Sequence, residues 1–136
     1  MTREPRWVTR QAVVAIHERL LAEHGGLPGL LDQGRLEAAL AHPRNRRRYA
    51  RADVFRLAAA YAHALTQDHP FRDGNKRVAL TVAGVFLELN GFRLEATEAE
   101  AVAAVLALTN HEMDEATFAR WLRATSVRAR RVRRRG

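Results

Sequence analysis

The feature that most constrains this chain is an apolar run of twelve residues, VALTVAGVFLEL at 78–89, in which only Thr81 and Glu88 are strongly polar. A helix that is apolar on every side has to be surrounded by protein. We therefore expect this run to form the central helix of the domain and to end at Asn90-Gly91. Hydrophobic residues make up 47% of the 136 residues, which is enough for a single core around such a helix.

The rest of the chain shows helical periodicity, and we find no alternating pattern typical of a strand. A first helix should end at Gly25-Gly26, and a short second helix should end at Pro43. Other helix starts are marked by side chains that cap: Thr9, Asp53, Thr97 with Glu100, and Asp114. We therefore predict an all-α domain of about six helices, without an internal repeat or a linker.

Two segments are rich in arginine. Residues 44–51 (RNRRRYAR) carry five arginines and no apolar period, which predicts an exposed loop or irregular strand. Residues 128–136 (RARRVRRRG) hold six of the 23 basic residues and no acid, which leaves 17 basic against 15 acidic residues, or +2, in 1–127. We therefore divide the chain into a domain at 1–127 and a basic tail at 128–136, which we expect to be disordered. Such a tail binds nucleic acid or an acidic surface, or only adds solubility.

Composition excludes several classes of protein. The chain has no cysteine, which excludes disulfides, thiol catalysis and cysteine-bound zinc. It has no apolar run of about 18 residues and no charged-then-apolar leader. We therefore expect a cytoplasmic globular protein with no membrane segment.

Nine residues directly before the apolar run, HPFRDGNKR at 69–77, bring polar groups to the start of the central helix. Gly74 removes a side chain at the point where that helix begins. The backbone N–H groups of Gly74, Asn75 and Lys76 would point outward unpaired and form an anion site with the helix dipole. Lys76 and Arg77 add two cations at the same helix end, so the site suits a polyphosphate.

Two other residues of this segment supply the remaining chemistry. Asp73 would repel phosphates unless a cation lay between them, and Mg²⁺ held by one carboxylate and by phosphate oxygens meets that condition. His69 can take a proton near neutral pH, so it is the candidate general base for an attacking hydroxyl. A base, a metal ligand and a phosphate cradle are what the transfer of a phosphorus-containing group requires.

The segment resembles the signature of the Fic/Doc family, HPFx(D/E)GNxR, at every specified position. Further similarity to the short Doc (death-on-curing) branch is found in these residues: His17, Gly25-Gly26, Gly34-Arg35-Leu36, Tyr49 and FLELNGF at 86–92. The resemblance covers about residues 7–124. It implies an all-α Fic fold, with a short flap before the third long helix, and a nucleotide-using enzyme that modifies hydroxyl groups of proteins.

The resemblance also implies a role for each residue of the segment. His69 is the base, Asp73 binds Mg²⁺, Gly74 and Asn75 form the anion-binding turn, and Lys76 and Arg77 grip the phosphates of ATP. The family's flap aligns the target protein, and we place it at 44–51. Arg46, Arg47 and Arg48 are therefore candidate contacts to the target.

Lys76 separates two possible reactions. Fic adenylyltransferases usually carry glycine at this position and Doc toxins carry lysine, which implies that ATP binds reversed and presents its γ-phosphate. Gly74 departs from the Doc prototype, which has alanine there. We favour a protein kinase, with adenylyl transfer as the alternative.

The partners follow from the same resemblance. No Ser or Thr here begins the inhibitory pattern [S/T]xxxE[G/N] of self-inhibited Fic proteins; Thr97, for example, has Ala101 where the glutamate would be. The resemblance then implies a toxin of a type II toxin–antitoxin pair, whose separate antitoxin covers the active site and whose first candidate target is translation elongation factor Tu. A second alternative is a non-catalytic module that holds RNA or ribosomes through its arginines.

Overall fold

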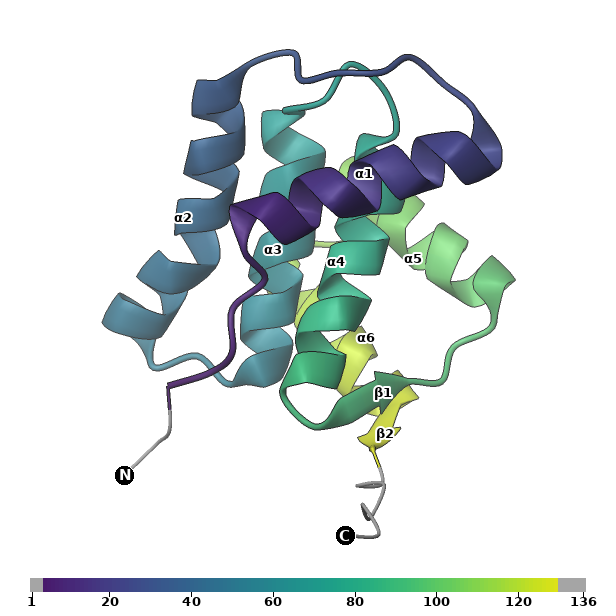
Figure 1. Cartoon of the computed structure of the whole chain (residues 1–136). Coiled ribbons are helices and arrows are strands. Elements are labelled where there is room, and N and C mark those ends of the chain that lie inside the picture. Colours follow the sequence, from purple (N-terminus) through teal and green to yellow (C-terminus); the bar gives the residue numbers. More distant parts are fainter. Residues whose placement is uncertain (1–3, 130–136) are drawn as a thin grey trace, which may run out of the picture.

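The computed structural model describes residues 4–129 and shows an all-α domain with one small sheet (Figure 1). The helices are α1 (Arg10–His24), α2 (Gln33–Ala50), α3 (Val54–Asp68), α4 (Asn75–Leu89), α5 (Glu98–Thr109) and α6 (Glu115–Thr125). The strands are β1 (Phe92–Leu94) and β2 (Ser126–Arg128). The predicted fold class is therefore confirmed.

Helix ends that depend on a local side chain lie where the sequence predicts them. Thr9 caps α1 by accepting the N–H of Ala12, and Asp53 caps α3 in the same way. Thr97 and Glu100 form the complete capping box of α5. Asp114 caps α6. These bonds join residues three positions apart, so they form wherever the local sequence allows them.

The helices α3 and α4 lie side by side at the centre of the domain. The helix α3 packs against α2, α4, α5 and α6, whereas α4 packs against α1, α3, α5 and β1. Leu80, Gly84 and Val85 on one face of α4 are only partly buried. The prediction that protein surrounds this helix on every side is therefore wrong for that face. The many buried alanines of α3 have little volume, so neighbouring helices approach it from several sides.

The prediction of an exposed loop or irregular strand for the arginine-rich segment 44–51 is wrong. Residues 44–50 form the last turns of α2, and Pro43 lies buried inside that helix instead of ending it. Arginine is a good helix former, and Arg46 is anchored by an ion pair to Glu115 of α6. This contact across the fold cannot be seen in the local pattern.

The prediction that the chain has no strand is also wrong. β1 pairs antiparallel with β2, with Phe92 opposite Arg128. Each strand has three residues, which is too short for a visible alternation. Arg128, the first residue of the predicted basic tail, therefore lies in the sheet, while residues 130–136 lie outside the described part of the chain. Among the described helices, none is both long and apolar enough to cross a membrane.

Candidate active site

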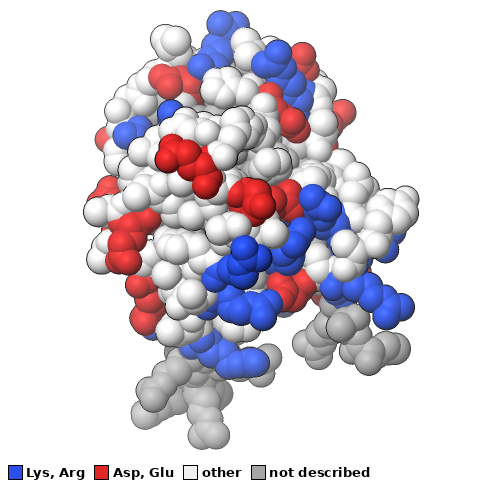
Figure 2. All heavy atoms as spheres, turned by 180° about the vertical axis from the view of Figure 1, so that it is seen from behind, with Lys and Arg blue, Asp and Glu red and all other residues white. Residues whose placement is uncertain are grey.

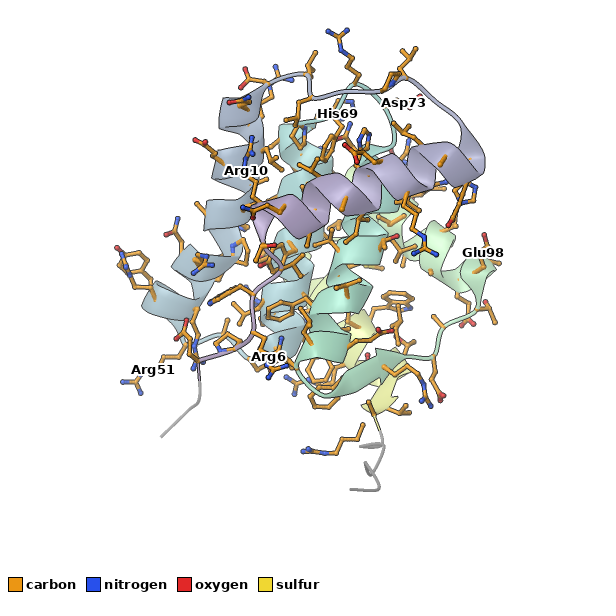
Figure 3. All side chains as sticks on the ribbon, viewed as in Figure 1. Arg6, Arg10, Arg51, His69, Asp73 and Glu98 are labelled. Carbon is orange, nitrogen blue, oxygen red and sulfur yellow. The ribbon has the colours of Figure 1, made fainter. Side chains whose placement is uncertain are left out.

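The connection between α3 and α4, residues 69–74 (the α3–α4 loop), brings the polar groups of the sequence motif to one end of the domain. The helix α3 ends before Pro70, which disfavours right-handed helical geometry at His69, and His69 adopts a left-handed conformation with φ 53° and ψ 56°. The side chain of His69 is exposed. Figure 3 shows His69 and Asp73 at the same end of the molecule, next to each other along this loop.

Asn75, the first residue of α4, holds the α3–α4 loop together from inside. Its Oδ1 accepts the N–H of Phe71 at 3.0 Å, and its Nδ2 donates to the carbonyl of Phe71 at 2.9 Å. Both residues are buried. The side chain of Asn75 is therefore engaged in the loop, and only its backbone N–H is available to an anion.

The amino end of α4 has the properties of an anion site. Gly74 precedes the helix with φ 80° and makes no side-chain cap. Within residues 4–129, the N–H groups of Asn75, Lys76 and Arg77 have no hydrogen-bond acceptor. The prediction that the N–H of Gly74 is also unpaired is wrong, because it donates to Oδ1 of Asp73. Lys76 and Arg77 are exposed beside them. Unpaired N–H groups, the helix dipole and two cations therefore act at one place.

The carboxylate of Asp73 is held by two backbone donors. Its Oδ2 accepts the N–H of Leu27 at 3.1 Å, and its Oδ1 accepts the N–H of Gly74 at 2.9 Å. These two bonds, Leu27 first, lower the pKa of Asp73 below its usual value, and the charge of Arg77 acts in the same direction. The carboxylate is therefore ionised and exposed, and each oxygen has a further lone pair for a cation.

A divalent cation would depend on Asp73 and on the phosphates together. The described residues contain no group of three or more His, Cys, Asp or Glu side chains that could hold a metal. Mg²⁺ in phosphoryl-transfer sites usually needs only one or two carboxylates and takes its other ligands from phosphate and water. The single ionised carboxylate beside an anion site therefore fits Mg²⁺ that arrives with a polyphosphate.

A pocket of about 410 Å³ brings the predicted residues together: His69, Asp73, Gly74, Asn75, Lys76 and Arg77 all line it. Its other wall is mostly apolar and comes from Leu80 of α4 and from Val102, Val105 and Leu106 of α5. Sequence reasoning missed this wall. Val102 and Leu106 remain partly exposed, and the sequence does not show that they face α4 until α5 is packed against that helix.

The connection between α1 and α2, residues 25–32 (the α1–α2 connection), is a second part of the site that sequence reasoning missed. It runs along the α3–α4 loop: Leu31 N–H donates to the carbonyl of Pro70 at 2.8 Å, and Arg72 N–H donates to that of Gly29 at 3.1 Å. Leu30 and Phe71 form an antiparallel bridge. An extended segment thus lies beside the loop, as expected of the flap, but at 25–32 and not at 44–51. The glycines of this segment and Pro28 were the sequence features that could have indicated an extended connection here.

The structure does not bring Arg46, Arg47 and Arg48 to the pocket. They lie in the last turns of α2, which Arg51 follows as the C-cap, and Figure 3 places Arg51 at the opposite end of the molecule from His69. The Nε of Arg46 is 2.8 Å from Oε2 of Glu115, which is 6% exposed. On the face shown in Figure 2, basic and acidic side chains lie next to one another. That face therefore offers no wholly positive surface in the described part of the chain.

Comparison with known proteins agrees with this geometry. Residues 7–87 match the Fic/DOC family, to which this chain belongs. It is 37% identical over 90 residues to the protein named Protein kinase doc of Escherichia phage P1, with 65% of this chain and 71% of that relative covered. It is 38% identical over 81 residues to Toxin Doc of Mycolicibacterium smegmatis, with 53% of this chain and 57% of that relative covered.

Proposed function

We propose that this protein is a Doc-like toxin, a protein kinase that transfers the γ-phosphate of ATP to a hydroxyl group of another protein. The observation that carries the proposal is the single pocket shared by His69, Asp73, Lys76 and the unpaired amino end of α4. The name of the phage relative, a protein kinase, supports the same reaction.

The proposed reaction needs a base and a cradle for negative charge. His69 takes the proton of the target hydroxyl, and the hydroxyl oxygen forms a bond to the γ-phosphorus. The bond from that phosphorus to the β–γ bridging oxygen breaks, and ADP leaves with the electron pair. The N–H groups at the start of α4, with Lys76 and Arg77, stabilise the charge on the phosphoryl group.

His69 is free for this role in the structure. Its exposed imidazole makes no hydrogen bond to any other described residue. Asp73 would hold Mg²⁺, which when bound supplies positive charge against the phosphate oxygens.

The target protein should bind beside the α1–α2 connection, since this extended segment lies along the α3–α4 loop. Leu27 and Leu31 are 63% and 49% exposed there and offer apolar contacts. Translation elongation factor Tu is the first candidate target. Arg46, Arg47 and Arg48 remain predicted contacts only for a target that extends to the far end of α2.

A separate antitoxin is the partner we propose for control of this site. Val102 and Leu106 line the pocket and are 43% and 39% exposed, so a chain that covers the pocket would bury apolar surface on α5 as well as block the nucleotide.

Labelled ATP tests the reaction directly. The protein is incubated with elongation factor Tu, or with a bacterial lysate, and with ATP labelled at the α or the γ phosphate. We expect label from the γ position only, lost in His69→Ala and Asp73→Ala and retained in the surface control Arg19→Ala. Label from the α position alone would replace the kinase by an adenylyltransferase. Lys76→Gly, which installs the residue usual in adenylyltransferases, should abolish γ transfer.

Toxicity in cells separates the kinase from the RNA-binding alternative. The kinase predicts that His69→Ala is harmless and that deletion of 130–136 stays toxic. This deletion leaves β2, and so the β1–β2 pair, in place. A toxic His69→Ala together with a harmless deletion would instead favour a non-catalytic module that binds RNA or ribosomes.

A further inference from the structure

His17 is a buried histidine directly beneath the α3–α4 loop, and the reaction proposed above does not use it. It lies on α1 and is 3% exposed. Its ring stacks on Phe71, with 3.9 Å between ring centroids and 15° between planes. The ring also lies 3.8–3.9 Å from the position that a Cβ on Gly74 would take. One side chain of α1 thus lies against the segment between α3 and α4, with its ring on Phe71 and next to Gly74.

The polar contact of His17 is to the backbone of Asp73. Its Nε2 is 2.9 Å from the carbonyl oxygen of Asp73. A carbonyl oxygen only accepts hydrogen bonds, so Nε2 carries the proton and donates it. The imidazole therefore holds the oxygen side of the peptide group that joins Asp73 to Gly74.

The nitrogen side of the same peptide group is held by the carboxylate. Gly74 N–H donates to Oδ1 of Asp73 at 2.9 Å. A peptide group is planar, so turning its C=O away from His17 also turns its N–H away from Oδ1. The orientation of the Asp73 carboxylate and the start of α4 are thereby coupled to the hydrogen bond from His17.

We propose that His17 is a positioning residue for phosphoryl transfer: by fixing the Asp73–Gly74 peptide group, it places the carboxylate and the amino end of α4 for the nucleotide. The proposal rests on the function proposed above. A histidine that only filled space would need the ring contact with Phe71 and not the hydrogen bond.

Two substitutions separate the ring contact from the hydrogen bond. His17→Phe keeps an aromatic ring against Phe71 and leaves the carbonyl of Asp73 without its donor. His17→Gln loses the ring but can bring an amide N–H near the position of Nε2. His24→Gln is the matched control, because His24 is an exposed histidine of the same helix.

The experiment measures thermal unfolding, MgATP binding by calorimetry, the amide NMR signal of Gly74, and kcat and KM for phosphoryl transfer. We expect His17→Phe to be folded, to shift the Gly74 signal, and to lower kcat/KM for MgATP about 10- to 100-fold, since misplacement by about 1 Å can cost that much. We expect His17→Gln to recover most of this loss and His24→Gln to match the unchanged protein.

Failure of this proposal differs from failure of the proposed function. The positioning role is overturned if His17→Phe is folded and has an unchanged Gly74 signal and an unchanged kcat/KM. It is also overturned if thermal unfolding shows that His17→Phe and His17→Gln have lost the folded structure to the same extent. If the unchanged protein transfers no phosphate, while His17→Phe still shifts the Gly74 signal and weakens MgATP binding and His17→Gln restores both, then the kinase fails and the positioning role stands.

Discussion

Gly26 lies against the carboxylate of Asp73: a Cβ on Gly26 would be 2.8 Å from Oδ2 of Asp73. Gly26 also has φ 120°, a conformation that side chains rarely allow. Its neighbour Leu27 donates its N–H to the same Oδ2. The turn after α1 therefore approaches the proposed magnesium ligand closely enough that only glycine fits.

Gly26→Ala should displace the Asp73 carboxylate. We expect the Mg²⁺ concentration for half-maximal phosphoryl transfer to rise, and the rate at saturating MgATP to fall about tenfold or more. Gly25→Ala is the matched control, because Gly25 also has a positive φ but no atom within 4 Å of the place that its Cβ would occupy. Gly25 has ψ −174°, outside the left-handed helical region, so the alanine should lower the free energy of unfolding by about 1–3 kcal/mol and leave the Mg²⁺ dependence unchanged. Equal Mg²⁺ dependence in both variants would contradict the contact.

Asn75→Ala should open the α3–α4 loop. It removes both hydrogen bonds to the backbone of Phe71 and leaves a buried N–H and a buried C=O unpaired. We expect the free energy of unfolding, measured with urea, to fall by about 2–4 kcal/mol. Asn75→Asp keeps the acceptor but places a buried carboxylate oxygen against the carbonyl of Phe71, so at neutral pH it should destabilise at least as much as Asn75→Ala. An Asn75→Ala variant as stable as the unchanged protein would show that these bonds do not hold the loop.

Glu115 should make the free energy of unfolding depend on pH in the acidic range. Burial alone raises its pKa, but hydrogen bonds from His42 and Arg46 and their charges outweigh burial and lower the pKa from 4.5 to about 2. Its stabilisation is therefore complete above pH 4.5 and is lost as the pH falls from about 4.5 to about 2. We expect Glu115→Gln to cost about 3 kcal/mol at about pH 6, with the difference from the unchanged protein shrinking as acid is added in urea titrations. A difference that does not change with pH would refute this coupling.

Arg46→Ala should destabilise the domain, because it leaves the buried carboxylate of Glu115 with one strong partner fewer. We expect a loss of about 1–3 kcal/mol in the free energy of unfolding. Arg48→Ala is the control from the same helix turn. Arg48 is exposed and, among residues 4–129, lies over the ring of Tyr49 without an ion pair, so its replacement should change stability by less than about 0.5 kcal/mol. Equal effects would mean that Arg46 has no structural role.

Local features of this chain were predictable from its sequence. Thr9, Asp53, Thr97 and Asp114 cap helices through bonds to residues three positions away, and such bonds need no knowledge of the rest of the fold. The polar segment at 69–77 could be interpreted for the same reason. The anion site that we propose there consists of consecutive residues at the start of one helix.

Contacts between distant parts of the chain were not predictable in this way. The segment 44–50 is helical and partly anchored because Arg46 meets Glu115, which lies on another helix. The apolar wall of the pocket exists because α5 packs against α4. Nothing in the local pattern of either segment contains these partners.

The chain order alone thus determined which residues could cradle a phosphate, since neighbours along one helix turn share their surroundings. The three-dimensional packing decided how these residues are held: His17, Gly26 and Leu27 reach Asp73 only because α1 crosses beneath the α3–α4 loop. Hydrogen bonding and steric exclusion act over a few ångströms in space, whatever the distance along the chain.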